Sequence, residues 1–323
     1  MKVCVTGGAG YIGSHTCKAL LQEGHEVIII DNFSSGRKEL ITGGTLIKED
    51  LQNQDRIRKI FKDHSVSAVC HFASLIQVGE SYCHPYKYYS ANLINSLNLL
   101  NAMRISGVDN IIFSSSAAVY GIPEEIPIPE HHECHPINPY GKTKFFIEEI
   151  LRDHSRAYGM NFVSLRYFNA AGADPDGELG EMHDPETHLI PNILLSLLKG
   201  GSRLKVYGTE FPTQDGTAVR DFIHVTDLAE AHVLALKYLL SGGKSRMINL
   251  GSSRGFSVLE IIRAAEKVTG RQIEYDIELP REGDVPVLLA SNSLAKKILK
   301  WSPRYSDIET IIRTAWNFHR RQS

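Results

Sequence analysis

A glycine-rich turn between an apolar strand and a helix constrains this chain more than any other feature. Residues 6–13 read TGGAGYIG, follow a short apolar run and open a helical pattern. Gly8, Gly10 and Gly13 fit the pattern GxGxxG, and Gly7, Gly10 and Gly13 fit a variant with even spacing. Without Cβ atoms such a backbone can turn sharply and approach a pyrophosphate, whose charge then rests on free amides at the helix N-terminus. In this strand-to-helix context the motif predicts a dinucleotide-binding site.

An acidic residue at the end of the next strand indicates which dinucleotide binds. Asp31 closes the apolar run Val27–Ile30, about 20 residues beyond Gly10. A carboxylate at that place accepts hydrogen bonds from both adenosine ribose hydroxyls and repels a 2′-phosphate. Arg37 is nearby and would favour a phosphate, but Asp31 is closer to the strand end, so we expect NAD rather than NADP. A tight turn without a ligand would not account for glycines, helix and acid together.

Short β-branched runs alternate with longer helical patterns in the first half of the chain. The runs are apolar throughout, as expected for strands that are buried on both faces of a parallel sheet. The fold class is therefore α/β, a Rossmann-like doubly wound parallel sheet with helices on both faces. The expected strands are Val3–Thr6, Val27–Ile30, Ala68–Ala73 and Asn110–Ser115, and later helical patterns cover Leu189–Lys199, Leu228–Leu240, Leu259–Val268 and Ile308–His319.

Turn-forming residues after Phe168 indicate a boundary between two lobes. Residues 169–177 read NAAGADPDG, a run of residues that favour turns. The elements beyond them are shorter and of mixed type. We expect an NAD-binding Rossmann domain built from residues 1–170 and 217–250. A smaller mixed α/β lobe from residues 171–216 and 251–323 is expected to bind the substrate.

Composition excludes several classes of protein. The 323 residues are 42% hydrophobic and 22% charged, which is typical of a globular protein rather than a disordered one. Lys and Arg total 35 against 37 Asp and Glu, for a net charge of -2, so no field gathers nucleic acid or an anionic membrane. Apolar runs are far shorter than the roughly 20 residues that cross a bilayer, and no signal peptide follows Met1. We expect a cytoplasmic protein without nucleic-acid or membrane partners.

The cysteines and one histidine-rich stretch raise the question of metal binding. Five cysteines, at positions 4, 17, 70, 83 and 134, are odd in number and irregularly spaced, which suits reduced structural thiols. Residues 131–135 read HHECH, but they lie among prolines in an apparent loop. Contiguous side chains there do not easily converge on one ion, so we expect no metal centre.

A serine, a tyrosine and a lysine form a candidate catalytic group. Residues 114–116 are three serines at the end of a buried strand, and Tyr140 begins a helical pattern that runs to about Ala157. Tyr140 and Lys144 are four residues apart and share one helical face. An adjacent ammonium and a positive nicotinamide ring favour the phenolate and are expected to move the pKa of Tyr140 toward working pH. Tyr140 is then able to act as a base.

Four blocks in order along the chain resemble those of one family. They are residues 114–121 (SSSAAVYG), 138–144 (NPYGKTK), 165–169 (LRYFN) and 219–224 (VRDFIH). The chain resembles an extended short-chain dehydrogenase/reductase and, within that superfamily, the UDP-glucose 4-epimerase family. The resemblance extends over essentially the whole chain.

The resemblance implies roles for individual residues. Ser116, Tyr140 and Lys144 are the implied catalytic residues, with Ser116 and Tyr140 at the sugar O4 and Lys144 on the nicotinamide ribose. The implied NAD-binding residues are Gly7, Gly10, Tyr11, Ile12, Gly13, Asp31, Asn32, Asp50, Leu51, Phe72, Ala73, Asn92, Tyr140, Lys144 and Tyr167. The implied UDP-sugar-binding residues are Ser116, Tyr140, Asn169, His188, Leu189, Lys205, Tyr207, Arg220, Arg281, Asp284 and Leu288.

The resemblance also implies a reaction. Tyr140 removes the O4 proton while the C4 hydrogen leaves as hydride to NAD, and Ser116 hydrogen-bonds the reacting oxygen. The 4-keto sugar turns in its pocket, and hydride returns to the opposite face. Arg220 and Arg281 match arginines near the substrate diphosphate, where guanidinium groups suit paired phosphate oxygens, although structural ion pairs would also explain them. The family further implies a homodimer through helices near Asn92–Ile105 and Thr143–His154.

Three positions depart from the family pattern. Many members carry a lysine that grips the cofactor where this chain has Ile76, so NAD retention is expected to be weaker. His188 stands where asparagine is common, and it could still donate to a uridine or phosphate acceptor. Leu288 stands where the residue is aromatic in some members and small in those that accept N-acetylated sugars. Leucine is intermediate in size, so we expect a preference for unacetylated UDP-glucose and UDP-galactose.

Three other functions are alternatives to the predicted epimerase function. The same chemistry on a UDP-pentose, xylose to arabinose, is an alternative because the sequence does not show whether C6 is required. A 4,6-dehydratase typically carries an Asp-Glu pair where this chain has Ala117 and Ala118, so the acid and base for eliminating water are missing. A catalytically silent NAD-binding regulator is disfavoured because Ser116, Tyr140 and Lys144 are all present.

Overall fold

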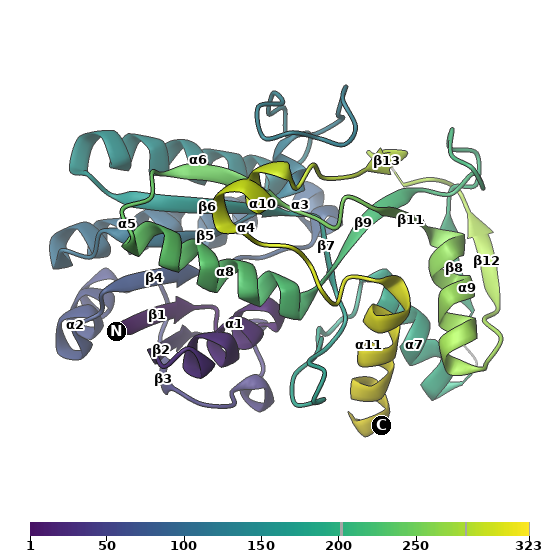
Figure 1. Cartoon of the computed structure of the whole chain (residues 1–323), viewed down its shortest axis with the longest axis horizontal. Helices are drawn as coiled ribbons and strands as arrows, with labels where there is room; N and C mark the ends of the chain where they lie inside the picture. The colour runs from purple at the N-terminus through teal and green to yellow at the C-terminus, as the bar shows by residue number, and fades with distance from the viewer. Residues whose placement is uncertain (201–202, 282, 323) are drawn as a thin grey trace.

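A seven-stranded parallel sheet forms the larger part of the protein (Figure 1). The computed structural model describes residues 1–200, 203–281 and 283–322. The strand order is β10-β6-β5-β4-β1-β2-β3, and every pairing is parallel. The strands are β1 (Lys2–Thr6), β2 (Glu26–Asp31), β3 (Thr45–Lys48), β4 (Ala68–His71), β5 (Asn110–Ser116), β6 (Asn161–Tyr167) and β10 (Arg246–Leu250). The order reverses between β1 and β4, and in open α/β sheets ligands bind at such a point, outside the carboxyl ends of the strands.

Alternating side chains of each strand enter two separate cores. Val3 and Val5 of β1 lie in one core, whereas Cys4 lies in the other, because successive side chains of a strand point to opposite faces. On the first face lie α1 (Tyr11–Gln22), α8 (Val225–Leu240) and α10 (Ser293–Leu299), and on the second lie α2 (Gln54–His64), α5 (Asn95–Ser106) and α6 (Pro139–Tyr158). The predicted doubly wound α/β sheet is therefore confirmed.

Short helical segments connect several of these elements. Between β4 and α5 the chain forms α3 (Val78–Cys83), α4 (Pro85–Tyr88) and a π-helical turn, η2 (Tyr89–Ile94). Single 3₁₀ turns, η1 (Lys38–Leu40) and η3 (Ala117–Val119), follow β2 and β5. These connections bring η2 and η3 against α6, so that three segments distant in sequence meet beside the end of β5.

The second lobe lies beside the carboxyl edge of the large sheet (Figure 1). Its core contains side chains of α7 (Leu189–Lys199), β8 (Leu204–Tyr207), α9 (Val258–Thr269) and α11 (Ile308–Gln322). β8 pairs in parallel with β12 (Tyr275–Glu278). A small sheet joins the two lobes and contains β7 (Asn169–Ala171), β9 (Val219–His224), β11 (Gly255–Ser257) and β13 (Val287–Leu288).

The structure differs from the sequence expectations at three places. β4 ends at His71 rather than Ala73, so Phe72 and Ala73 begin the loop that faces the glycine turn. The turn-rich stretch after Phe168 begins with a strand, β7, because its backbone pairs with β9. α10 lies within the range 251–323 that the sequence assigned to the substrate lobe, yet it packs against α8 and β10 of the large sheet. In the described part of the chain, no helix combines the length and apolar character needed to cross a membrane.

Candidate active site

The glycine turn is held close to the loop that follows β4. Gly7 has a φ of 74°, and its N–H donates to the Ile30 carbonyl at 2.9 Å. A Cβ atom on Gly7 would lie 2.6 Å from the backbone nitrogen of Ala73, which is closer than two such atoms can approach. Gly13 faces the Gly7 carbonyl in the same way. The glycines therefore allow β1, α1 and the loop after β4 to meet at the crevice.

Three polar residues lie together where β2 and β3 end. Asp31 accepts hydrogen bonds from the N–H groups of Ala9 at 2.9 Å and Phe33 at 2.8 Å. Burial raises the pKa of Asp31, and these two hydrogen bonds lower it. Asn32 donates to the Asp50 carboxylate at 2.7 Å. Each carboxylate oxygen has two lone pairs, so Asp31 keeps capacity to accept from a ligand hydroxyl.

Arg37, the residue that could have favoured a 2′-phosphate, contacts a different segment. Its Nε donates to the Met182 carbonyl at 3.3 Å, and its guanidinium lies 3.6 Å from the Asp184 carboxylate. These contacts direct the charge of Arg37 toward residues 182–184. The arrangement thus favours NAD over NADP for the reason given by the sequence, a carboxylate at the strand end.

Most of the other residues predicted to bind NAD are apolar or aromatic, and one, Asn92, is a buried amide. Leu51 is buried in the second core, and the Phe72 ring centroid lies 4.7 Å from that of His232. Asn92 is fully buried in η2, accepts from Leu75 N–H at 2.7 Å and donates to the Leu75 carbonyl at 3.0 Å. Asn92 therefore fixes the loop after β4, which also carries Ile76, 40% exposed. Tyr11 and Ile12 open α1.

The three predicted catalytic residues converge at the end of β5 and the start of α6. Ser116 ends β5 and its hydroxyl accepts from Ala118 N–H at 3.1 Å. Asn138 caps α6 by accepting from Gly141 N–H at 2.7 Å, which places Tyr140 in the first turn. The Lys144 ammonium lies 5.8 Å from the centroid of the Tyr140 ring.

Buried hydrogen bonds hold the Lys144 ammonium. It donates to the Ser74 hydroxyl at 2.9 Å and to the Ser114 carbonyl at 2.8 Å. The Ser114 hydroxyl in turn hydrogen-bonds Tyr167, another predicted NAD-side residue. Ser74 was not among the predicted site residues. Its position next to Ala73 was the only sequence signal, since the contact joins segments far apart in the chain.

Burial is the largest influence on the pKa values of Tyr140 and Lys144. Burial lowers the pKa of Lys144 to about 7, and the Glu148 carboxylate raises it. Burial raises the pKa of Tyr140, and a hydrogen bond to Ser116 lowers it. Loss of water around the Tyr140 ring thus outweighs the neighbouring hydroxyl. The expected movement of the Tyr140 pKa toward working pH depends on a positive nicotinamide ring as well and stays a prediction.

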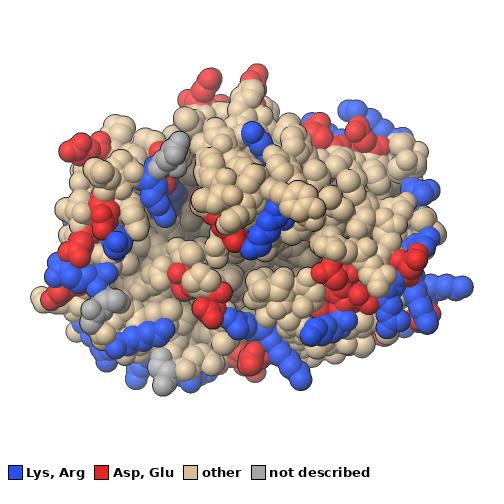
Figure 2. Space-filling view, turned by 180° about the vertical axis from the view of Figure 1, so that it is seen from behind, with Lys and Arg blue, Asp and Glu red and all other residues tan. Residues whose placement is uncertain are grey.

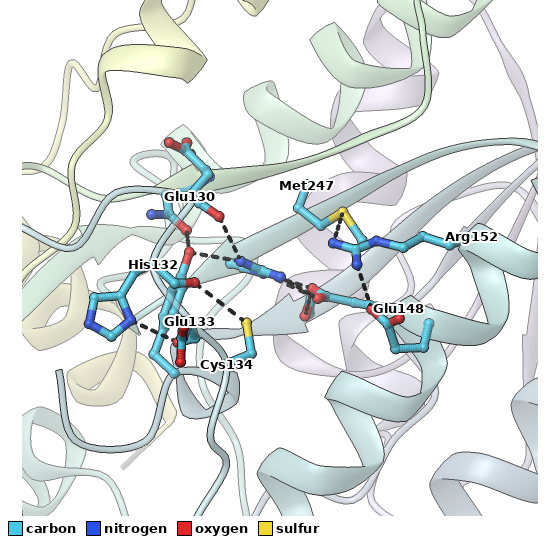
Figure 3. Close-up of polar contacts among 12 residues, drawn as sticks. Glu130, His132, Glu133, Cys134, Glu148, Arg152 and Met247 are labelled. Atoms are coloured by element: carbon cyan, nitrogen blue, oxygen red, sulfur yellow. Dashed lines mark hydrogen bonds and ion pairs between the residues drawn. The ribbon is translucent and has the colours of Figure 1, made fainter.

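A buried ion pair, Glu148 with Arg166, lies one helical turn after Lys144 and was not predicted from the sequence. Glu148 of α6 and Arg166 of β6 are 0% and 2% exposed, and the Arg166 Nη2 lies 2.6 Å from the Glu148 carboxylate. Glu148 also accepts from the Ser115 hydroxyl at 2.6 Å. Arg166 donates to the Tyr120 hydroxyl at 2.9 Å and to the Glu130 carbonyl at 3.5 Å. Figure 3 shows Glu130 and Glu148, two of the residues that accept hydrogen bonds from Arg166. The pair therefore fixes α6 against the end of β5, next to Ser116.

Two arginines from the predicted substrate site share one carboxylate. Asp284 lies 3.9 Å from the Arg220 guanidinium and accepts from Arg281 Nε at 3.3 Å. The Arg281 guanidinium stacks 4.9 Å from the centroid of the Tyr207 ring. Burial lowers the pKa of Arg220, and that burial strengthens its attraction for an anion. Leu288 is the register partner of Arg220 between β13 and β9, so these five residues form one cluster.

The other residues predicted to bind the substrate lie outside the cluster around Asp284. Asn169 begins β7 and pairs with Phe222 of β9. Lys205 forms an exposed ion pair with Glu278 at 3.1 Å. His188 precedes α7, which begins at Leu189, and its Nδ1 lies 2.8 Å from Glu181 and 2.9 Å from Glu186. The structure therefore pairs His188 with carboxylates.

The surface charge offers no broad attraction for an anion on the face seen in Figure 2. Basic and acidic side chains are interspersed there, and the face is hollowed near its centre. Local groups such as Arg220 and Arg281 are therefore the candidates for holding an anionic ligand. Together, the parallel sheet, the glycine turn and the Ser–Tyr–Lys group define the class, a nucleotide-dependent enzyme of the short-chain dehydrogenase/reductase type.

Comparison with known proteins places the chain within that class. Residues 3–251 match the NAD dependent epimerase/dehydratase family. A UDP-glucose 4-epimerase of Rhizobium meliloti is 45% identical over 99% of this chain and 98% of its own length. The crystal structure of a UDP-glucose 4-epimerase from Brucella ovis with NAD is 46% identical, with a TM-score of 0.95 over 98% of this chain and 97% of that one. A UDP-glucose 4-epimerase of Stenotrophomonas maltophila, solved with NAD and formylated UDP-arabinopyranose, is 38% identical with a TM-score of 0.96 over 100% and 98% of the two chains. The chain belongs to the NAD-dependent epimerase/dehydratase family and, within it, to the UDP-glucose 4-epimerases.

Proposed function

We propose that this protein is a UDP-glucose 4-epimerase, which reversibly inverts C4 of UDP-galactose and UDP-glucose. The observation that carries the proposal is the convergence of Ser116, Tyr140 and Lys144 beside the glycine turn, where Lys144 is held by Ser74 and Ser114. Full-length relatives with this activity in their names support the same conclusion.

NAD is the cofactor, and the residues of the crevice fit it. The glycine turn leaves room for a pyrophosphate at the start of α1, and Asp31 keeps acceptor capacity for the adenosine ribose. NAD held there would supply a reversible hydride acceptor for C4 of the sugar. The protein's task is to orient the sugar and to move the O4 proton.

Tyr140 takes the proton from O4 and gives it back, while Ser116 hydrogen-bonds the same oxygen. Burial raises the pKa of the Tyr140 hydroxyl, so deprotonation depends on the positive charge beside it. The Lys144 ammonium, one helical turn away, supplies that charge while it also orients the nicotinamide ribose. A Lys144 pKa of about 7 means that its protonation changes near neutral pH, where it affects the readiness of Tyr140 to act as a base.

The arginine cluster holds the substrate diphosphate. Arg220 and Arg281 already converge on Asp284, and a diphosphate offers both guanidinium groups additional charged acceptors. Tyr207 keeps Arg281 in place through ring stacking. Asn169, Leu189 and Lys205 complete the proposed UDP-sugar contacts, and His188 retains Nε2 as the ring nitrogen that could reach the nucleotide.

Leu288 limits the sugar to unacetylated hexoses. It packs against the cluster of Val119, Tyr120 and Ile128, so an acetamido group would have to displace packed side chains. Turnover of UDP-N-acetylglucosamine should therefore be at least about 10-fold below that of UDP-glucose. Comparable rates for the two would remove this part of the proposal.

The two-lobe division and the homodimer belong to the same proposal. Residues 1–170 and 217–250, together with α10, carry NAD, and the second lobe carries the nucleotide of the substrate. Exposed apolar side chains on α5 and α6, including Leu97 at 40% and Phe146 at 41%, support a dimer through these helices. A Phe146→Glu change should lower the solution mass measured by light scattering, whereas Leu240→Glu on α8 should leave it unchanged.

The cytoplasm is the proposed location, in keeping with five free cysteines.

The experiment that tests the function is a coupled assay with UDP-galactose, with and without added NAD. UDP-glucose should appear without net NADH, and the dependence on added NAD measures how firmly the cofactor is held with Ile76 in the loop. Tyr140→Phe should lower kcat by at least about 100-fold and leave bound NAD unchanged. Tyr86→Phe, at a side chain that is 82% exposed, is the matched control and should keep its rate.

UDP-xylose is the substrate for the second candidate function. The Stenotrophomonas relative binds a formylated UDP-arabinopyranose, so a pentose fits at least one site of this kind. If UDP-galactose is not converted although NAD is bound, conversion of UDP-xylose would favour a pentose epimerase. Absence of both reactions would leave a silent NAD-binding regulator.

A further inference from the structure

The segment between β7 and α7 brings two glutamates and two histidines together. Glu181, His183, Glu186 and His188 each offer one ligand atom, and the four atoms lie within 4.8 Å of one another. The sequence suggested only His188 as a nucleotide contact. The grouping depends on the path of the segment, which ends at the first turn of α7.

The ligand atoms surround a common point. The Nδ1 atoms of His183 and His188 lie 2.9 Å and 2.8 Å from the same oxygen of Glu181. The Glu186 carboxylate lies 2.9 Å from Nδ1 of His188 and 3.9 Å from Nδ1 of His183. A tetrahedral zinc ion with bonds of about 2.0–2.2 Å holds neighbouring ligand atoms roughly 3.3–3.5 Å apart. A shift of about half an ångström per atom would thus convert the cluster into a four-coordinate site.

The carboxylates of this cluster are buried, so a positive charge close to them would stabilise them. The side chains of Glu181 and Glu186 are 4% and 8% exposed, and two carboxylates this close repel each other when water is excluded. Arg37 contacts the same segment but pairs with Asp184. Among the described residues, no lysine or arginine forms an ion pair with Glu181 or Glu186.

The surroundings show what an ion at this point would fasten. The His183 ring lies 6.3 Å from the Tyr11 ring at the start of α1, and 5.0 Å from the His188 ring at the start of α7. Met182, between Glu181 and His183, packs against the apolar cluster that contains Phe318 of α11. The cluster therefore lies where the helix of the glycine turn meets two helices of the second lobe. His183 and His188 are 19% and 38% exposed, which leaves a route of entry for an ion.

We propose that Glu181, His183, Glu186 and His188 bind one divalent transition-metal ion, zinc in the first place, as a structural link between the lobes. Imidazole and carboxylate ligands suit zinc and cobalt better than magnesium or calcium, which prefer oxygen ligands only. Four protein ligands close the coordination shell, as in structural rather than catalytic zinc sites. His188 is also a proposed nucleotide contact through its Nε2, whereas Glu181, His183 and Glu186 lie outside the proposed substrate site.

Metal titration of the full chain, purified without a histidine tag and stripped with EDTA, tests the proposal. Cobalt chloride should give one equivalent of bound Co²⁺ with the intense visible absorption of four-coordinate cobalt, and zinc chloride should displace it. Zinc should also raise the melting temperature by roughly 4 °C or more. Binding well below one equivalent, or a spectrum of six-coordinate cobalt, would overturn the proposal. Neither readout uses substrate, so failure of the epimerase assay would not affect the result.

Variants locate the ion. His183→Gln and Glu186→Gln should each weaken Co²⁺ binding by at least about 100-fold. The matched control is His135→Gln in the exposed loop at residues 131–135, where His135 and Glu133 are 2.7 Å apart, and it should bind like the wild type. Loss of binding in the control with retention in His183→Gln would place the ion in that loop and refute the assignment. If a variant does not fold, the stoichiometry and spectrum of the wild type still decide.

Discussion

At the scale of single residues, two glycines with the same backbone conformation have different surroundings. Gly7 and Gly24 have φ values of 74° and 78°. A Cβ atom on Gly7 would lie 2.6 Å from Ala73 N, whereas nothing lies within 4 Å of one on Gly24. The left-handed conformation costs an ordinary residue about 1–2 kcal/mol at either position. Close approach at the crevice adds to that cost only at Gly7.

Gly7→Ala should therefore be much more harmful than Gly24→Ala. We expect Gly24→Ala to lower the free energy of unfolding by about 1 kcal/mol and to retain NAD. Gly7→Ala should lose NAD binding as well, because the loop after β4 must move away from the glycine turn. Thermal melting and the nucleotide content of the purified variants measure the two effects. Equal NAD content in both variants would show that the close contact is not required for the cofactor site.

At the scale of elements, α6 combines an N-terminal cap, a turn that carries the candidate catalytic residues and a buried ion pair. Asn138 caps it, Tyr140 and Lys144 lie on one face, and Glu148 continues that face one turn further. Asn138 accepts from Gly141 N–H, and Asn53 caps α2 by accepting from Arg56 N–H. The two caps use the same chemistry, but only the cap of α6 lies beside a candidate catalytic residue.

Asn138→Ala and Asn53→Ala should thus be separable by activity. Both should lower the free energy of unfolding by about 1 kcal/mol, since each leaves a helix N–H without its acceptor. Only Asn138→Ala should lower kcat, because fraying of the first turn displaces Tyr140. Urea unfolding and steady-state kinetics of both variants provide the comparison. An unchanged kcat in Asn138→Ala would show that other contacts fix Tyr140.

The Glu148–Arg166 pair should contribute far more than an exposed pair of the same type. Glu148→Gln leaves the buried Arg166 without its counter-charge, which should lower the free energy of unfolding by roughly 3–5 kcal/mol. The control is Glu274→Gln, whose partner Arg203 lies 2.9 Å away with both side chains more than half exposed. It should cost about 0–1 kcal/mol. Similar losses in the two variants would contradict the anchoring role of Glu148.

At the scale of the whole molecule, four of the buried histidines have a strongly lowered pKa. Burial lowers the pKa of His15 and His232 to about 4 and that of His71 and His224 to about 3. The unfolded chain binds these protons near pH 6.5. The unfolded state therefore holds more protons than the folded state as the pH falls below that value, so stability is lost with acidification.

Acid sensitivity should follow from these four groups. Burial raises the pKa of Asp221 to about 6, and this carboxyl binds a proton in the folded state that offsets one of the four. About three net protons remain, which corresponds to a loss of roughly 4 kcal/mol per pH unit at most between pH 6 and 4. His232→Leu should reduce the proton uptake by one, and urea unfolding at several pH values measures it. A slope that is the same in His232→Leu would show that His232 does not contribute.

Local pattern was sufficient for much of the fold and for the catalytic core. The glycine turn, the strand that ends at Asp31 and the helix that carries Tyr140 and Lys144 were all predicted, because strand and helix periodicities and their breaks are written in consecutive residues. Element ends were less certain. β4 stops at His71 and α10 joins the large sheet for reasons that depend on neighbours distant in sequence.

The sequence by itself determined the α/β order of elements, the dinucleotide motif and the serine, tyrosine and lysine that fit the chemistry. Only the tertiary structure decided which groups surround them. Ser74 reaches Lys144 across 70 positions of the chain, and Glu148 meets Arg166 between a helix and a strand. The burial that lowers the pKa of Lys144 and raises that of Tyr140 also comes from packing. Desolvation and long-range hydrogen bonds depend on distances in space, which residue order alone does not fix.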